Sequence, residues 1–338
     1  PYDIWPPQGK EEAFGMESRI MKVLDVVVAL YANTDLIRKG NYFSFTDVES
    51  LHSDFQAIED IVTDVPVDGT LIILDMPCAP EVHAAGDTVV VRGPFGQLEE
   101  AMSDKRYTLL GNQGLLYRFL LYQLEKKYGI YSFHANALYQ RERNELFVVF
   151  GGAASGKSPA LMAGICNGLE VVGTELVHFR LSGQGYTFYP SSCMDNIRPS
   201  CVWEDFPELL GKLEVPDPHE FSSPSSKYLL DMQAFKTRGP IANPRLRLII
   251  PKVEAGRSPV ISDKIFDDGA KTKALFDNLS EKIGASFSMY NCMACNGFDC
   301  LELSRRRLTA ARDLLEAAGS PAVETYLASP RYFLEVLQ

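Results

Sequence analysis

The sequence lacks any apolar run that could cross a bilayer, and it lacks an excess of positive charge. A membrane-spanning helix needs about 20 consecutive apolar residues, and no run here approaches that length. The 44 acidic residues outnumber the 33 basic ones, which gives a formal net charge of −11. Such a surface repels the phosphates of nucleic acids and of anionic lipids. We therefore expect a protein that binds neither nucleic acid nor a membrane.

The chain also lacks a leader-like start and an even set of cysteines. It begins with Pro1-Tyr-Asp-Ile-Trp5, without a basic region or an apolar core, so we expect no signal peptide. Seven cysteines are an odd number, which is typical of reduced thiols and predicts a cytoplasmic protein. Cys292, Cys295 and Cys300 stand close together, but no fourth ligand lies nearby. Free or packed thiols are therefore favoured over a metal site.

The length and composition indicate a globular protein with two parts. The chain has 338 residues, of which 46% are apolar and 23% charged, enough for two cores. We expect an N-terminal α/β module of unknown role over residues 1–105. Residues 106–338 should form a second domain with helices at its C-terminal end. A homo-oligomer is compatible with this composition.

The most informative motif is a phosphate-binding loop. Residues Gly151-Gly-Ala-Ala-Ser-Gly-Lys-Ser158 fit the pattern G-x-x-x-x-G-K-[ST]. An apolar strand, Leu146 to Phe150, precedes the motif, and a helix from Pro159 to Asn167 should follow it. In this context backbone N–H groups and the helix N-terminus surround a polyphosphate. We expect ATP or ADP with Mg²⁺, bound by the loop residues Gly151, Gly152, Ala153, Ala154, Ser155, Gly156, Lys157, Ser158 and Pro159.

The expected roles within this loop differ from residue to residue. Lys157 should reach the β- and γ-phosphates, and Ser158 should contact the metal. Pro159 suits the first turn of a helix, where a backbone N–H is not needed.

The elements around the loop predict a hairpin and a returning strand. A helix is expected over 112–128, then one continuous strand over 130–139 that pairs with the strand entering the loop. Further strands are expected at 169–172, 186–189 and 246–250, and further helices near 270–283 and over 304–318. Residues 191–224 and 251–268 are expected to form loops, the first with short helices.

Two residues near the loop are candidates for chemistry. Glu175 follows a buried strand, and a second acidic residue at such a position commonly holds Mg²⁺ in these proteins. The alternative is an exposed glutamate in a turn. His134 lies in an apolar strand, where a histidine is as readily a core residue with a satisfied hydrogen bond.

Together these features resemble the HPr kinase/phosphorylase-like kinases, which share a core with ATP-dependent phosphoenolpyruvate carboxykinase. The resemblance rests on His134-Ala-Asn-Ala, the loop, its helix and the stretch Thr174-Glu175, and it is specific over 134–175. It is looser for the stretches around Arg198, Lys227 and 244–251. It implies a P-loop kinase core of this family's type, joined to the N-terminal α/β module.

The resemblance also implies roles for single residues. His134, Lys157 and Glu175 would be catalytic, Ser158 and Glu175 would hold the metal, and Arg198 and Lys227 would contact the substrate. The family carries an aspartate as catalytic base where this chain has Thr174. A threonine hydroxyl is not a base, so the nucleotide site looks complete while the base position does not.

Three functions follow from this pattern. The first is an ATP-dependent kinase that phosphorylates a hydroxyl on a protein or peptide serine or on a small molecule. The second is a nucleotide-binding regulator or scaffold that has lost transfer activity. The third is a carboxykinase-like enzyme, which is disfavoured because no second metal site can be placed. The sequence does not identify the acceptor.

Overall fold

The computed structural model describes residues 16–37, 55–58 (backbone only), 66–111, 113–152, 154–183, 185–221, 223 and 226–338. The chain divides into two compact units, each described by itself below. The described part of unit 1 comprises residues up to Tyr128 together with Ala285–Phe298, and unit 2 comprises Gly129–Gly284 and Asp299–Gln338. The division thus falls 23 residues beyond the expected boundary at 105, and a later segment returns to the first unit.

Unit 1 is built on a six-stranded mixed sheet with the order β3-β1-β2-β4-β6-β5. Its central strands β2, β4 and β6 run parallel, and the outer strands are antiparallel to their neighbours. Apolar side chains in the middle of the sheet are fully buried because helix α3 packs against β2. The elements are β1 (Glu17–Val23), β2 (Val26–Ala32), η2 (Asp35–Ile37), β3 (Phe55–Ile58), β4 (Gly69–Asp75), β5 (Glu81–Ala85), β6 (Thr88–Gly93), α2 (Phe95–Ala101), η3 (Lys105–Tyr107) and α3 (Leu115–Tyr128).

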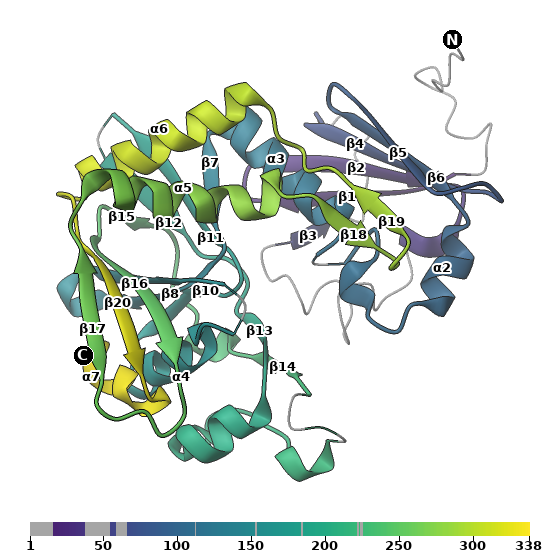
Figure 1. Ribbon diagram of the computed structural model, residues 1–338. Coiled ribbons are helices and arrows are strands. Elements are labelled where there is room, and N and C mark those ends of the chain that lie inside the picture. Colours follow the sequence, from purple (N-terminus) through teal and green to yellow (C-terminus); the bar gives the residue numbers. More distant parts are fainter. Residues whose placement is uncertain are drawn as a thin grey trace. The chain divides into compact units, whose positions relative to one another are not determined.

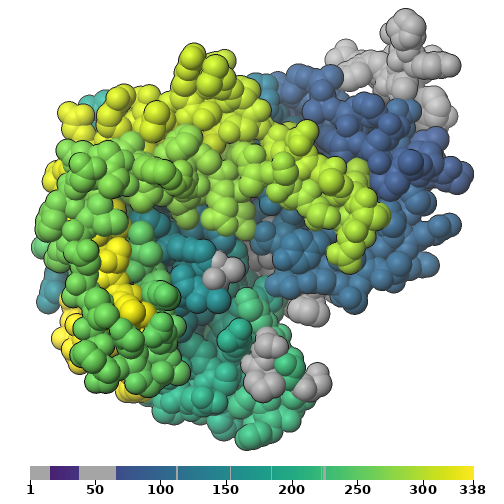
Figure 2. Space-filling view, viewed as in Figure 1, coloured from purple at the N-terminus to yellow at the C-terminus, as the bar shows by residue number. Residues whose placement is uncertain are grey.

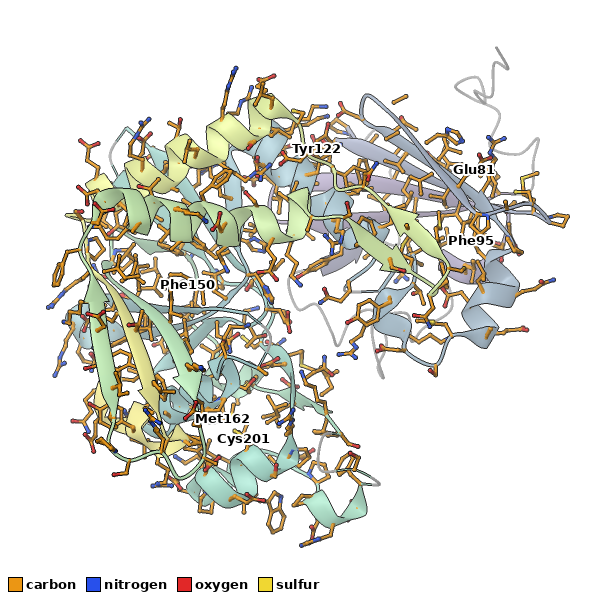
Figure 3. All side chains as sticks on the ribbon, in the orientation of Figure 1. Glu81, Phe95, Tyr122, Phe150, Met162 and Cys201 are labelled. Carbon is orange, nitrogen blue, oxygen red and sulfur yellow. The ribbon has the colours of Figure 1, made fainter. Side chains whose placement is uncertain are left out.

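The returning segment of unit 1 is a small hairpin of β18 (Phe287–Met289) and β19 (Met293–Cys295). Its turn residue Tyr290 is anchored to the rest of the unit by its hydroxyl, which donates to Glu99 Oε1 at 2.7 Å and accepts from the Leu109 N–H at 3.0 Å. The ring of Tyr290 also lies 6.0 Å from the ring of Phe95, which is labelled in Figure 3. These long-range contacts explain why a segment distant in sequence belongs to the first unit.

Unit 2 contains the loop and a second six-stranded sheet, ordered β10-β8-β9-β16-β20-β17 (Figure 1). Strands β9, β16 and β20 are parallel, while β8 and β10 add an antiparallel edge. A four-stranded sheet, β15-β12-β11-β7, and a two-stranded one, β13-β14, complete the strands of this unit.

The strands of unit 2 are β7 (Ile130–Phe133), β8 (Ala135–Gln140), β9 (Glu145–Phe150), β10 (Glu170–Gly173), β11 (Val177–Ser182), β12 (Gly185–Tyr189), β13 (Met194–Ile197), β14 (Tyr228–Asp231), β15 (Ile241–Ala242), β16 (Arg245–Val253), β17 (Ile261–Ile265) and β20 (Val323–Ala328). The helices are η4 (Arg141–Arg143), α4 (Lys157–Cys166), η5 (Cys201–Asp205), η6 (Pro207–Leu209), η7 (Pro218–Glu220), η8 (Gln233–Phe235), α5 (Asp268–Gly284), α6 (Leu301–Ala317), η9 (Pro330–Tyr332) and α7 (Phe333–Val336).

Strand β9 is buried on both faces, and its side chains alternate between two cores. Phe147 and Val149 pack with α4 and α7, and Met162, labelled on α4 in Figure 3, lies in that core. Leu146, Val148 and Phe150 point into the other core, with the four-stranded sheet and helices α5 and α6. A strand covered on both faces reads as a continuous apolar run, which is why residues 146–150 are recognisable in the sequence.

The structure confirms a mixed α/β protein and corrects three local expectations. Residues 130–139 do not form one strand, because the chain breaks at His134 and continues as β8 in a different sheet from β7. The segments expected as loops carry strands β13 and β17. Strand β17 is exposed at nearly every position, so it lacks the apolar alternation by which a strand is recognised. Among the described residues, no helix is both long enough and apolar enough to traverse a bilayer.

Candidate functional site

The phosphate-binding motif lies in a loop between β9 and α4, as its sequence predicts. The backbone of this loop adopts positive φ at Gly151 (150°), Ala154 (61°) and Gly156 (113°). A Cβ atom at Gly156 would lie 2.2 Å from Cγ2 of Val253 on β16, so only glycine fits there. Ala153 falls outside the described residues. The loop therefore curls tightly over the carboxyl end of the parallel strands, and its last glycine leads directly into α4.

Two side chains in the loop fit a bound polyphosphate. The Lys157 ammonium donates to the carbonyl oxygens of Gly151 at 2.7 Å and Gly152 at 3.3 Å, so it lies over the loop. The Ser155 hydroxyl is buried and has no partner among the described residues. Pro159 stands in the first turn of α4, where it removes no hydrogen bond. The Lys157 ammonium, the unpaired Ser155 hydroxyl and the N-terminus of the ten-residue helix α4 can all interact with the oxygens of an anion. Among the described residues, the loop therefore suits an anion with several oxygens.

The hydroxyl of Ser158 donates to Asp195 Oδ2 at 3.1 Å. Asp195 lies on β13 and is 6% exposed. Burial, with the negative charge of Glu175 as a smaller cause, raises the pKa of Asp195 to about 6. Asp195 was not predicted as a site residue, because the many Pro and Ser residues of 191–224 indicated a loop. Apolar Met194 and Ile197 beside it were the available signal of a short strand.

His134 lies between two carboxylates. Its Nε2 is 3.2 Å from Oε2 of Glu175, and its Nδ1 is 2.7 Å from Oε1 of Glu281 on α5. Burial acts to lower the histidine pKa, but the hydrogen bonds to both glutamates outweigh it and raise the pKa. Glu281 is a second residue that sequence reasoning missed, since it comes from a helix 147 residues away.

Glu175 is held in place by its backbone as well as by His134. Its φ of 62° is unusual for a non-glycine residue. Its side chain is 32% exposed, and the Lys282 ammonium lies 3.9 Å from Oε2. Burial would raise its pKa, but the His134 hydrogen bond and the charge of Lys282 hold the pKa of Glu175 well below its usual range. Glu175 is therefore an ionised carboxylate in an ion pair rather than a free glutamate in a turn.

Strand direction brings this pair to the phosphate loop. Strand β8 is antiparallel to both β9 and β10, so β9 and β10 end at the same edge of the sheet. His134 stands just before β8, opposite the end of β9, because Ala135 pairs with Phe150. The charge of Lys157 contributes to the low pKa of Glu175 and partly opposes the rise in the pKa of Asp195. The loop, His134, Glu175 and Asp195 thus form one site.

Thr174 does not face this site in the way the family resemblance implies. Its side chain is buried, and its hydroxyl bonds to the carbonyl oxygens of Ser192 at 3.0 Å and Met194 at 2.6 Å. It therefore fastens the end of β10 to the segment that enters β13. This contact positions the strand that carries Asp195.

Arg198 and Lys227 stand next to each other at one end of the two-stranded sheet. Ile197 of β13 pairs with Tyr228 of β14, so Arg198 and Lys227 flank the same end of this ladder. Both side chains are exposed. The positive charge of Lys227 acts to lower the pKa of Asp195. The two residues expected to contact substrate thus lie just after β13, which carries Asp195, and just before its partner strand β14.

Comparison with known proteins supplies no family for this chain. No protein-family model matches it, and neither does any curated protein. The assignment of a function depends on the site itself.

Ser158 and Asp195 are the residues beside the loop that could hold a metal ion. The described residues contain no cluster of three or more His, Cys, Asp or Glu that could enclose an ion. Magnesium is commonly held by one or two protein oxygens, with phosphate oxygens and water completing its six ligands. Ser158 and Asp195 provide such a pair beside the loop. Cys292, Cys295 and Cys300 are free thiols.

Proposed function

We propose that this chain binds a nucleoside triphosphate with Mg²⁺ and transfers its γ-phosphoryl group to a hydroxyl acceptor. The observation that carries the proposal is the Ser158–Asp195 contact at the phosphate loop. A hydroxyl from the motif and a carboxylate from a neighbouring strand are the metal-binding pair of many P-loop proteins. We further propose that unit 2 is a P-loop kinase core of the HPr kinase type.

Different residues of the site would have different roles in the transfer. The loop backbone, Lys157 and the N-terminus of α4 would bind and orient the phosphates. Ser158 and Asp195 would hold Mg²⁺, which neutralises charge on the phosphate oxygens. His134 positions Glu175 through the 3.2 Å contact and keeps it ionised.

The chemistry requires one proton acceptor. The acceptor oxygen bonds to the γ-phosphorus, the bond to the bridging oxygen breaks, and ADP leaves with that electron pair. We propose Glu175, which pairs with His134 beside the loop, as the carboxylate that receives the hydroxyl proton. Its lowered pKa makes it a weak base, which a loose transition state tolerates because little proton transfer is needed before the bond to phosphorus breaks.

A second candidate is a nucleotide-binding regulator without transfer activity. The position of Thr174 favours it, since the residue at the family's base position is buried and bonded to backbone carbonyls. Both candidates require nucleotide binding, and only the first requires turnover.

Two measurements test the proposal. Calorimetry with ADP and Mg²⁺ should give an affinity at least about 10-fold lower for Lys157→Ala, or about 1.4 kcal/mol, and an unchanged affinity for the exposed control Lys212→Ala. Equal affinity in all three proteins, or none in the wild type, would refute nucleotide binding by this loop. Incubation with γ-labelled ATP and a cell extract should then label an acceptor. Binding without labelling would leave the regulator as the function.

A further inference from the structure

Unit 2 contains a cavity of about 470 Å³ that none of the proposed roles uses. Helices η5 and η7 and the strand ends beside them form its walls. This segment, coloured teal to green, lies at the surface in Figure 2. The volume is that of a small-molecule site. Its described lining includes Pro199, Trp203, Glu204, Asp217, Pro218 and His219.

The walls of the cavity are tied together by hydrogen bonds. The indole N–H of Trp203 donates to the carbonyl of Pro216 at 3.0 Å, which links η5 to the segment before η7. Asp217 Oδ1 accepts from the His219 N–H at 2.8 Å and caps η7. Trp203 is nevertheless 39% exposed, an unusual fraction for this residue type, and it lines the cavity. The aromatic wall is therefore fixed in place and accessible.

The charge of the cavity is negative. The lining carries two carboxylates, those of Glu204 and Asp217, and no Lys or Arg among its described residues. The pKa of the neighbouring Cys201 thiol rises to about 12, first because of burial and then because of nearby carboxylates, Glu204 among them. The basic residues nearby, Arg198 and Lys227, directly adjoin the lining residues Pro199 and Ser226 at the end of the β13–β14 ladder. An aromatic ring beside two carboxylates attracts an organic cation.

The cavity lies close to the phosphate site along β13. Asp195 and the lining residue Pro199 are four residues apart, so their Cα atoms are at most about 14 Å apart. Arg198 stands between them in the sequence. An acceptor long enough to span this distance, with its cation in the cavity, would bring its hydroxyl towards Asp195 and Ser158.

We propose that this cavity binds the cationic nitrogen of the phosphoryl acceptor, so that the acceptor is a small hydroxyl-bearing amine. Trp203 contacts the cation through its ring, and Glu204 and Asp217 balance its charge. This inference rests on the proposed function for the transfer step, whereas cation binding by the cavity can be tested without it.

Choline and 3,3-dimethylbutan-1-ol provide a matched pair of probes, because they have the same shape and differ in charge. Calorimetry on the full chain should show choline binding at least about 10-fold more tightly than the neutral alcohol. The double variant Glu204→Gln/Asp217→Asn keeps the cap on η7 and should lose about 10-fold or more in choline affinity. Trp203→Leu should weaken choline binding as well.

Controls separate this inference from a folding defect and from the proposed function. Glu214→Gln removes an exposed charge from the same segment outside the lining and should leave choline affinity unchanged. The cavity variants should retain ADP affinity, and Lys157→Ala should retain choline affinity. Equal binding of both probes, or full choline affinity in the double variant, overturns the cation site even if ADP binds. Choline binding without ADP binding refutes the proposed function and leaves the cation site standing.

A separate experiment tests whether the phosphoryl acceptor is an amine. A metabolite extract is divided on a cation-exchange resin at neutral pH, and each fraction is incubated with the protein and γ-labelled ATP. Labelled product should arise from the retained, cationic fraction. Label arising only from the flow-through, or from neither fraction, overturns the assignment of an amine acceptor.

Discussion

The Ser158 hydroxyl donates to the carboxylate of Asp195 across 3.1 Å, although the two residues lie 37 positions apart on α4 and β13. The contact joins the end of the phosphate-binding motif to a strand that the sequence does not reveal. It brings a buried carboxylate to the motif serine, the position at which we propose that Mg²⁺ binds. The predictions below begin with this pair.

Replacing Asp195 with Asn should abolish most of the Mg²⁺ dependence of nucleotide binding. The amide oxygen can still accept from Ser158, but the negative charge that attracts the metal is lost. We expect ADP affinity in Mg²⁺ to fall about 10-fold or more, towards the value measured in EDTA. Asp231→Asn, on the exposed face of the partner strand β14, is the control. An equal loss of ADP affinity in both variants would show that the integrity of the β13–β14 sheet, rather than the Asp195 carboxylate, determines binding.

Glu175→Gln should have a smaller effect on Mg²⁺ dependence than Asp195→Asn. Glu175 is paired with His134 and Lys282, so its charge is largely balanced within the protein. Its loss should instead lower turnover with γ-labelled ATP by about 10²-fold or more, as expected for removal of a proton acceptor. A loss of Mg²⁺ dependence as large as that of Asp195→Asn would make Glu175 the metal ligand.

Thr174→Asp should destabilise the protein rather than supply a missing base. The new carboxylate would be buried against the carbonyl oxygens of Ser192 and Met194, which offer it no proton. We expect a loss of at least about 2 kcal/mol in the free energy of unfolding, measured with denaturant. Thr174→Ser keeps the hydroxyl and should be close to wild type. A stable Thr174→Asp protein with increased turnover would show that this side chain reaches the phosphates.

The Glu324–Arg247 pair should make stability fall in acid. Burial would raise the pKa of Glu324, but hydrogen bonds from Arg247 and Tyr326 lower it. Since the folded pKa lies below the unfolded value of about 4.5, the pair stabilises fully above that pH and less as pH falls through the folded pKa. Glu324→Gln should cost about 2 kcal/mol at pH 7, with a deficit that shrinks below pH 4.5. The exposed Glu335→Gln is the control, and a deficit independent of pH would contradict the assignment.

Thiol reactivity should distinguish the exposed Cys292 and Cys300 from the half-buried Cys166 and Cys201. Cys292 and Cys300 are exposed, whereas burial raises the pKa of Cys166 to about 11 and that of Cys201 to about 12. With Ellman's reagent at pH 8, the exposed pair should react at least about 10-fold faster than the other two. Cys292→Ser/Cys300→Ser should remove this fast phase. If added Zn²⁺ protects these thiols from the reagent, Cys292 and Cys300 bind a metal and are not simply free thiols.

The position of the phosphate loop could be predicted from the sequence, because the residues that define its conformation are adjacent in the chain. Gly151 and Gly156 occupy backbone conformations that favour glycine, Lys157 follows directly, and the strand before them is apolar because both of its faces are buried. The same reasoning located α5, α6 and the sheet strands with clear periodicity. Exposed β17 and the short strand β13 were missed, since neither carries a pattern that local reasoning can recognise.

Tertiary structure alone decided which side chains complete the site. Asp195 reaches Ser158 because β13 runs past the N-terminus of α4, and Glu281 reaches His134 because α5 packs beside β7. Both contacts join residues far apart in sequence, and such pairings cannot be predicted from a single sequence. The break at His134 follows the same rule, because the strands on either side of it belong to different sheets. Local order is encoded by spacing and side-chain type, whereas the meeting of distant carboxylates depends on how the sheets pack.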